Sequence, residues 1–210
     1  MTTAPLARAG TAFLLQAHAL RRLAIGPVDL ALASGECVSV MGASGAGKSV
    51  LLRMLADLDP HEGDASLDGA RCSAMPAPEW RRQVAYVPAD SGWWSARVGD
   101  HFLAGTDYAT LFPKIGIAAE AATWRVSRLS TGERQRLALL RAIRPGVKVL
   151  LLDEPTSGLD GESVARVETL LRQQLETGIA VLMVTHDPAQ ARRVASRHFE
   201  LREGRLAVAA

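Results

Sequence analysis

The chain has 210 residues, enough for one substantial hydrophobic core with a small additional lobe. Hydrophobic residues make up 48% and charged residues 22%, values that are typical of a folded protein and exclude a disordered one. The formal net charge of +2 is too small for nucleic-acid binding by bulk electrostatics, and the basic residues are scattered, so we expect no nucleic-acid partner.

Cysteine content and hydropathy favour a cytoplasmic protein. Cys37 and Cys72 are too few for a disulfide framework. No apolar run approaches the roughly 18 to 20 residues needed to cross a bilayer. We also expect no signal peptide, because the first residues do not combine a charged start, an apolar stretch and a small-residue cleavage site. If the chain acts at a membrane, we expect another polypeptide to hold it there.

In chain order, the first predicted elements are strands. Short apolar runs separated by turns predict strands over 11–41, ending with a strand over 37–41. A glycine-rich loop follows, and the apolar residues from Val50 to Leu55 have the spacing of a helix. Residues 63–69 then predict a hairpin turn, and residues 83–87 another strand.

The second half of the chain begins irregularly and then becomes regular. Residues 89–128 contain Gly, Pro and three of the four tryptophans, which indicates a separate small lobe. Helices are predicted over 131–143, over 161–176 and from Pro188, with strands over 147–152 and 179–184. Strands that alternate with helices and are apolar throughout predict a mostly parallel sheet covered on both faces.

The glycine-rich loop matches the phosphate-binding pattern G-x-x-x-x-G-K-[ST], between a strand and a helix as that motif requires. Its backbone N–H groups can surround phosphate oxygens, and the following helix directs its positive end at them. Lys48 adds a charge for the β- and γ-phosphates of ATP, and the Ser49 hydroxyl can bind Mg²⁺. The predicted nucleotide site comprises Gly42, Ala43, Ser44, Gly45, Ala46, Gly47, Lys48, Ser49 and Val50.

The predicted strand over 147–152 runs directly into two carboxylates, Asp153 and Glu154. Adjacent side chains on a strand point in opposite directions, so the two carboxylates need different roles. Asp153 is predicted to hold Mg²⁺ through its water shell, and Glu154 to polarise the attacking water. A solvated acidic turn is the alternative, which the presence of the phosphate-binding loop disfavours.

Residues 129–133, Leu-Ser-Thr-Gly-Glu, open the next helix. Ser130 and Glu133 have the spacing of a capping box, which by itself would only start a helix. The segment also resembles the LSGGQ signature of ABC ATPases. Downstream, Ser157-Gly158-Leu159-Asp160 looks like the D-loop of that family, and His186 matches its switch histidine. An ordinary contact at a helix start is the alternative for His186. The resemblance rests on five ordered motifs within residues 42–187.

The resemblance implies an α/β fold: a P-loop NTPase core with a mostly parallel sheet, an antiparallel β subdomain and a small, shortened helical subdomain. One ABC ATPase domain would span residues 1–210. Residues 1–88 and 144–210 would form the nucleotide-binding core with the β subdomain, and residues 89–143 the helical lobe that carries the signature.

The resemblance also implies a head-to-tail dimer with a second copy or a homologous ATPase subunit. Each ATP site would combine the P-loop of one subunit with the signature of the other. Glu154 and His186 would be catalytic, and Asp153 and Ser49 would hold the metal. The residues acting in trans would be Ser130, Thr131, Gly132 and Glu133, with Asp160 in the D-loop.

The sequence departs from the family pattern in three places. Ala89 stands where the Q-loop glutamine is expected, so that either Asp90 replaces it or the site works without this contact. The aromatic residue that stacks on adenine is missing; His18 is the best candidate, and apolar contact alone is the alternative. The segment between residue 89 and the signature is short, which predicts a small lobe.

Trp93 and Trp94 follow directly after the altered Q-loop. Adjacent residues of an extended segment cannot both enter one small core. Either one tryptophan fills the core while the other meets a partner, or both are structural.

The predicted function is that of an ATP-binding and ATP-hydrolysing subunit that powers a multi-span membrane subunit encoded as a separate chain. Through that partner it would lie on the inner face of the cell membrane. The alternative is a soluble ABC ATPase of translation or DNA repair, but those usually carry two cassettes or a long coiled-coil insertion. A small-molecule kinase would leave residues 129–133 and 157–160 without a role.

Overall fold

A computed structural model describes residues 13–209. The prediction about a signal peptide and the first two residues of the predicted strand region lie outside this range. Between residues 13 and 209, no helix combines the length and hydrophobicity that a membrane span needs.

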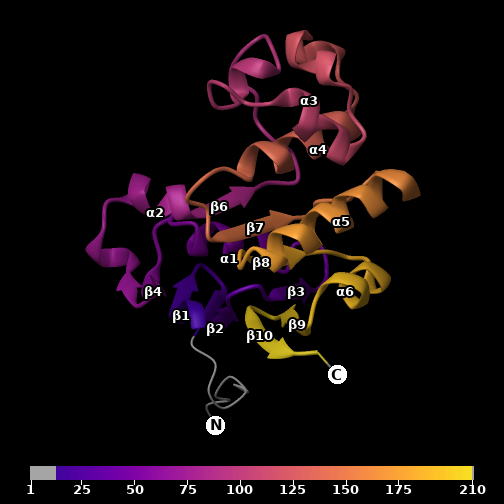
Figure 1. Cartoon of the computed structure of the whole chain (residues 1–210). Helices are drawn as coiled ribbons and strands as arrows, with labels where there is room; N and C mark the ends of the chain where they lie inside the picture. The colour runs from indigo at the N-terminus through magenta and orange to yellow at the C-terminus, as the bar shows by residue number, and fades with distance from the viewer. Residues whose placement is uncertain (1–12, 210) are drawn as a thin grey trace.

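Two β-sheets organise the chain (Figure 1). The first is antiparallel, with the order β2-β1-β4-β5. Its strands are β1 (Phe13–Arg22), β2 (Ile25–Ala33), β4 (Glu62–Leu67) and β5 (Ala70–Arg71). This sheet is the antiparallel β subdomain that the family resemblance implied.

The second sheet has the order β10-β9-β3-β8-β7-β6. All its neighbours pair in parallel except β10, which is antiparallel to β9. Its strands are β3 (Cys37–Met41), β6 (Val84–Val87), β7 (Val149–Asp153), β8 (Ala180–Val184), β9 (Arg197–Arg202) and β10 (Arg205–Val208). Every residue of β7 and β8 is buried, because both faces of this sheet are covered.

The two faces of the parallel sheet pack into different cores. Val149 and Leu151 of β7 join one core with α1 and the antiparallel sheet, whereas Leu150 and Leu152 join the other core with α4 and α5. The larger helices are α1 (Lys48–Leu55), α2 (Ala77–Gln83), α4 (Thr131–Ala142), α5 (Gly161–Glu176) and α6 (Pro188–Val194). The predicted sheet with helices on both faces is confirmed.

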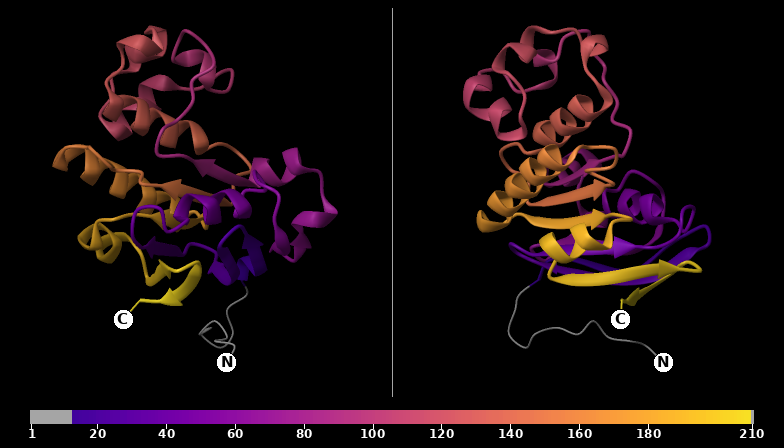
Figure 2. Two further views of the ribbon diagram at one scale, coloured as in Figure 1. Left: turned by 180° about the vertical axis from the view of Figure 1, so that it is seen from behind. Right: turned by 90° about the vertical axis from the view of Figure 1, so that its right-hand side faces the viewer.

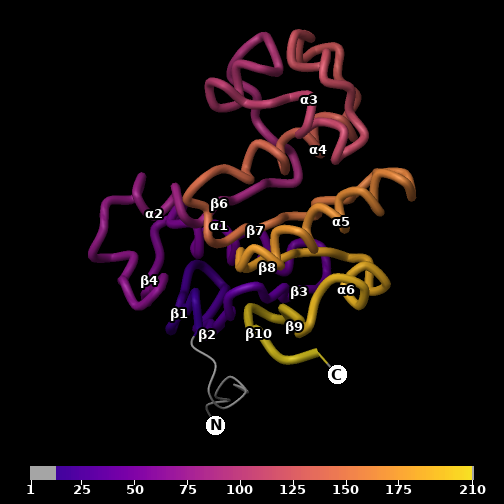
Figure 3. The backbone as a smooth tube through the Cα atoms, in the orientation of Figure 1, coloured from indigo at the N-terminus to yellow at the C-terminus, as the bar shows by residue number. Residues whose placement is uncertain are grey.

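Between β6 and α4 the chain forms a lobe at the end of the molecule opposite to β1 and β10 (Figures 2 and 3). It holds α3 (Tyr108–Leu111) and four 3₁₀ helices, Gly99–His101, Phe112–Ile115, Ala119–Thr123 and Val126–Arg128. Phe102, Tyr108 and Phe112 pack ring against ring at its centre. These aromatic residues join the core that also contains α4, α5 and one face of the parallel sheet.

One element prediction is right only in part. The hairpin turn expected over residues 63–69 is mostly the strand β4, and the turn itself lies at Asp68 and Gly69. Gly63 has a positive φ of 77°, and a Cβ there would meet the carbonyl oxygen of Ala19 at 2.4 Å. The glycine that suggested a turn instead lets two paired strands approach closely.

Candidate functional site

The predicted site residues gather at one edge of the parallel sheet. The glycine-rich loop follows β3, Asp153 ends β7, and His186 follows β8, and these three strands lie side by side in the order β3-β8-β7. Because the strands are parallel, their carboxyl ends meet at the same edge, where α/β proteins bind ligands.

At two positions in the loop over residues 42–49, the backbone conformation and the neighbouring atoms leave room only for glycine. Gly42 and Gly47 have φ values of 146° and 96°. A Cβ on Gly42 would meet the Leu201 carbonyl oxygen at 2.4 Å, and one on Gly47 the Ile25 side chain at 2.2 Å. The Lys48 ammonium donates to the carbonyls of Gly42 (2.7 Å) and Ala43 (2.9 Å). The lysine therefore lies across the mouth of a loop that is open to solvent at Ala43, Ser44 and Gly45.

Asp153 is a buried carboxylate, 6% exposed, with few protein partners. The Tyr86 hydroxyl donates to its Oδ2 at 3.1 Å, and this is the one hydrogen bond to the carboxylate within residues 13–209. Burial, and next the charge of Asp153, raise the pKa of Tyr86, so the hydroxyl remains a donor at neutral pH. A carboxylate can accept about four hydrogen bonds, and a buried one is costly without a cation. Asp153, with the Ser49 hydroxyl at the start of α1, therefore fits Mg²⁺, which prefers oxygen ligands.

Glu154 has different partners from Asp153, but not for the reason expected from strand alternation. Strand β7 ends at Asp153, and Glu154 turns the chain with a positive φ of 51°. The Gln135 amide donates to the Glu154 carbonyl at 2.6 Å. The Glu154 Oε2 atom lies 2.7 Å from Nδ1 of His186, whose side chain is 69% exposed. The carboxylate and the imidazole are thus joined at the surface of the site.

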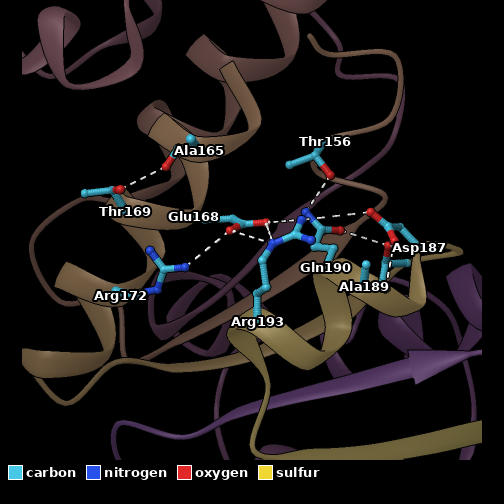
Figure 4. Close-up of polar contacts among 10 residues, drawn as sticks. Thr156, Ala165, Glu168, Thr169, Arg172, Asp187, Ala189, Gln190 and Arg193 are labelled. Carbon is cyan, nitrogen blue, oxygen red and sulfur yellow. Dashed lines mark hydrogen bonds and ion pairs between the residues drawn. The ribbon is translucent and has the colours of Figure 1, made fainter. Parts of the chain in front are cut away.

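A buried amide ties together the loops that carry Glu154 and His186. Gln190 of α6 is fully buried, accepts from the Thr185 hydroxyl at 2.9 Å and donates to Thr156 Oγ1 at 2.6 Å. Figure 4 shows its contact with Thr156 and, beside it, Arg193 reaching across to Glu168 of α5. These contacts fix α6, and with it the segment before His186, against the loop after β7.

The signature segment begins α4 with a capping box, as the S-x-x-E spacing predicted. Ser130 Oγ accepts from the Glu133 N–H at 3.2 Å, and the Glu133 carboxylate accepts from the Ser130 N–H at 2.8 Å. Ser130 and Thr131 are exposed, whereas Gln135, one turn later, is buried against Glu154. The helix therefore connects an open N-terminus to the chain's own carboxylate site.

Asp160 is the N-cap of α5. The N–H and the hydroxyl of Ser163 both donate to it at 2.9 Å, and they hold the pKa of Asp160 below its usual range. The Arg136 guanidinium also donates to the Ser163 hydroxyl. Asp160 is thus fixed to the signature helix through one serine.

Two of the three departures from the family pattern involve residues at the surface. Ala89 and Asp90 follow β6 and are exposed. The His18 side chain is 88% exposed on β1, and its Nδ1 lies 2.9 Å from Asp29. The proposed substitutes for the glutamine and for the adenine-stacking residue therefore stay predictions.

A groove of about 800 Å³ lies between the lobe and the core, beside the edge strand β6. Leu58, Trp94 and Leu103, which line it, are 39%, 72% and 57% exposed. Trp93 instead packs against the core beneath the lobe, and the Arg141 guanidinium lies 4.8 Å from its ring and 4.6 Å from the ring of Trp94. The two tryptophans thus differ in exposure, as the first of the two predicted alternatives requires.

Sequence reasoning missed Tyr86, Gln135 and Gln190. Gln135 lies in the run after the signature, so its position was visible, although its contact with Glu154 was not. No local pattern marks Tyr86 or Gln190, because their contacts depend on which strands and loops are neighbours.

Comparison with known proteins agrees with this geometry. A family model described as ABC transporter matches residues 25–157. An aliphatic sulfonates import ATP-binding protein from Frankia alni is 39% identical over 185 residues, which cover 85% of this chain and 71% of that protein. A probable anion import ATP-binding protein from Haloferax volcanii is 36% identical, with 81% and 69% covered.

The fold has close structural counterparts. A dimeric ATP-binding cassette in a post-hydrolysis state, bound to ADP and Pi, superposes with a TM-score of 0.80 at 24% identity and covers 92% of this chain and 98% of that one. The alternative of a soluble factor in translation or DNA repair is not favoured by these relatives. The chain therefore belongs to the ABC transporter family, as one of its ATP-binding, ATP-hydrolysing subunits.

Proposed function

We propose that this chain hydrolyses ATP at sites shared with a second copy or a homologous subunit, and that it drives a multi-span membrane subunit bound in the groove beside β6. The observation that carries the proposal is the 2.7 Å contact between Glu154 and His186, at the sheet edge that also holds the P-loop and Asp153. In this proposal the membrane subunit holds the chain on the cytoplasmic side of the cell membrane.

Each residue at the sheet edge has a distinct role in this proposal. The P-loop residues 42–50 bind the phosphates, with Lys48 moving from its two backbone carbonyls to the β- and γ-phosphates. Asp153 and Ser49 hold Mg²⁺, which neutralises charge on the phosphate oxygens when it is bound.

The contact with His186 gives the two carboxylate oxygens of Glu154 different roles. Oε2 is engaged by the imidazole, so Oε1 is the atom free to accept a proton from the attacking water. With both ring nitrogens protonated, the Nδ1–H of His186 donates to the carboxylate, and the Nε2–H, which faces away from it, donates to the γ-phosphate. The histidine then fixes both the base and the phosphate that the water attacks.

The signature acts on the nucleotide of the other subunit in this proposal. The Ser130 hydroxyl accepts the capping hydrogen bond and so keeps its proton for an outside acceptor. The α4 N-terminus adds its positive dipole end, and the N–H groups of Thr131 and Gly132 lie in its first turn. Asp160, whose carboxylate accepts a hydrogen bond from Ser163, lies at the N-cap of the adjoining helix α5.

Glu133 introduces a negative charge at this helix start. Replacing it with glutamine is expected to tighten the ATP-driven dimer about two- to five-fold, because the amide oxygen still caps Ser130 while repulsion of the phosphate disappears. Sedimentation with ATP and Mg²⁺ measures the dimer dissociation constant. Glu162→Gln, in the first turn of α5, is the matched control and should leave it unchanged. A weaker Glu133→Gln dimer with unaltered melting temperature contradicts this role.

The groove is proposed as the seat of the membrane subunit because Leu58, Trp94 and Leu103 leave apolar surface exposed in it. Trp94 combines a large apolar surface with a polar edge, as residues at protein interfaces often do. The Trp94 ring packs on Arg141 at the end of α4. A partner that displaces Trp94 would therefore act directly on the helix that begins with the signature.

Truncating side chains that line the groove is expected to uncouple ATP hydrolysis from the membrane subunit. In liposomes that contain its multi-span membrane subunit, Trp94→Ala should lower partner-stimulated ATP hydrolysis about ten-fold, and Leu103→Ala less. Val208→Ala, which is 64% exposed and lies outside the groove, is the matched control for Leu103→Ala and should keep the stimulation. Full stimulation of Trp94→Ala, or a large fall in its melting temperature without the partner, contradicts the docking role.

A further inference from the structure

Tyr86 lies beside the metal carboxylate because of the strand order. It is on β6, the edge strand, and its Cα pairs with Leu151 on β7. Asp153 is two residues further along β7, so Tyr86 and Asp153 leave the sheet on the same face. The hydroxyl spans the remaining distance and donates to Asp153 Oδ2 at 3.1 Å.

The phenol is a well-anchored donor. Its ring is half-buried and packs against the core that contains α1, the helix that begins at Lys48 and Ser49. Within residues 13–209 no other donor forms a hydrogen bond to the Asp153 carboxylate, so this contact is the one hydrogen bond that orients the carboxylate plane. With Oδ2 engaged by Tyr86, Oδ1 is the oxygen left for a ligand.

We propose that Tyr86 is a positioning residue for Asp153: its hydroxyl holds the carboxylate so that Oδ1 is presented to Mg²⁺ and its water shell. Groups that hydrogen-bond a metal ligand fix its orientation, and their loss typically lowers metal affinity by about 10- to 100-fold. Because Asp153 holds the ion through water, we expect the lower end of this range. The inference rests on the proposed role of Asp153 as the Mg²⁺ ligand.

The experiment separates nucleotide binding from metal binding. Binding of fluorescently labelled ATP is measured first in EDTA and then across a Mg²⁺ titration. Tyr86→Phe should bind ATP as the wild type does in EDTA but need about ten-fold more Mg²⁺ for its half-maximal effect. Tyr108→Phe is the matched control, because the Tyr108 hydroxyl also donates at 3.1 Å, to Gly99 in the lobe. It should give the wild-type Mg²⁺ curve.

Asp153→Asn separates this inference from the proposal beneath it. If Asp153→Asn shifts the Mg²⁺ curve and Tyr86→Phe does not, the positioning role is wrong while the role of Asp153 stands. If Asp153→Asn gives the wild-type curve, both are wrong.

A double variant covers the case in which Tyr86→Phe lowers stability. In the Asp153→Asn background the substitution of Tyr86 should shift the Mg²⁺ curve no further, because the two residues act as one unit. An equal shift in both backgrounds would show a general structural effect and overturn the inference.

Discussion

Replacing Glu154 with glutamine should leave ATP binding intact and lower the hydrolysis rate by about 10²- to 10⁴-fold, the usual contribution of a positioned general base. The amide has the shape of the carboxylate and can still accept a hydrogen bond from His186, so the site keeps its geometry. It cannot take the proton of the attacking water. The rate is measured at saturating ATP and Mg²⁺.

The same variant should accumulate a dimer with ATP bound, because association proceeds and hydrolysis does not. Size-exclusion chromatography with ATP and Mg²⁺ detects this species, and omission of Mg²⁺ or use of ADP should return the monomer. Glu176→Gln, an exposed residue at the end of α5, is the control and should behave as the wild type. Hydrolysis by Glu154→Gln at the wild-type rate would falsify the assignment of the base.

The parts of the fold that depend on local pattern could be predicted from the sequence. Apolar residues run without a break over residues 149–152 of β7 and through β8, and only a sheet covered on both faces buries such strands completely. The spacing of Ser130 and Glu133 likewise predicted the start of α4. The pattern of the glycine-rich loop predicted both the loop and the elements beside it, because the motif requires a strand before it and a helix after it.

The parts that depend on tertiary neighbours could not be predicted. Gly63 suggested a turn because glycine is common in turns, but here the absent side chain relieves a clash between β1 and β4. Strands β9 and β10 were not predicted either. In β9, polar residues alternate with Phe199 and Leu201, as in a half-buried strand. This pattern is so short, and follows a helix so closely, that the sequence alone did not reveal it.

The candidate site divides in the same way. Lys48, Asp153 and Glu154 belong to motifs with a fixed spacing along the chain. Tyr86 meets Asp153 only because β6 is the neighbour of β7, and Gln190 meets Thr156 only because α6 folds back beside the loop after β7. Even the separate role of Glu154 was predicted for the wrong reason, since the chain leaves the strand before that residue.

Mixing two inactive variants should restore hydrolysis if the sites are shared between subunits. Lys48→Ala removes the phosphate charge of the P-loop, and Ser130→Ala removes the hydroxyl offered to the other subunit, so each protein alone should be nearly inactive. A mixed dimer contains one site that joins the intact P-loop of one chain to the intact signature of the other. Its second site combines both defects.

The size of the recovery follows from the symmetry of the dimer. If the two variants associate at random in equal amounts, half of the dimers are mixed and each has one intact site in two, so activity should reach about a quarter of the wild-type value. Ser130→Ala also removes the N-cap of α4, so the melting temperature of each variant is measured beforehand.

The control replaces the Ser130→Ala partner with a chain that carries both substitutions. It should give no recovery, because no mixed dimer then contains an intact site. Wild-type hydrolysis by Ser130→Ala alone, or a mixture no more active than its two parents, would mean that each chain completes its own site. Specific activity of the wild type should meanwhile rise with protein concentration, since a monomer holds a P-loop but no facing signature.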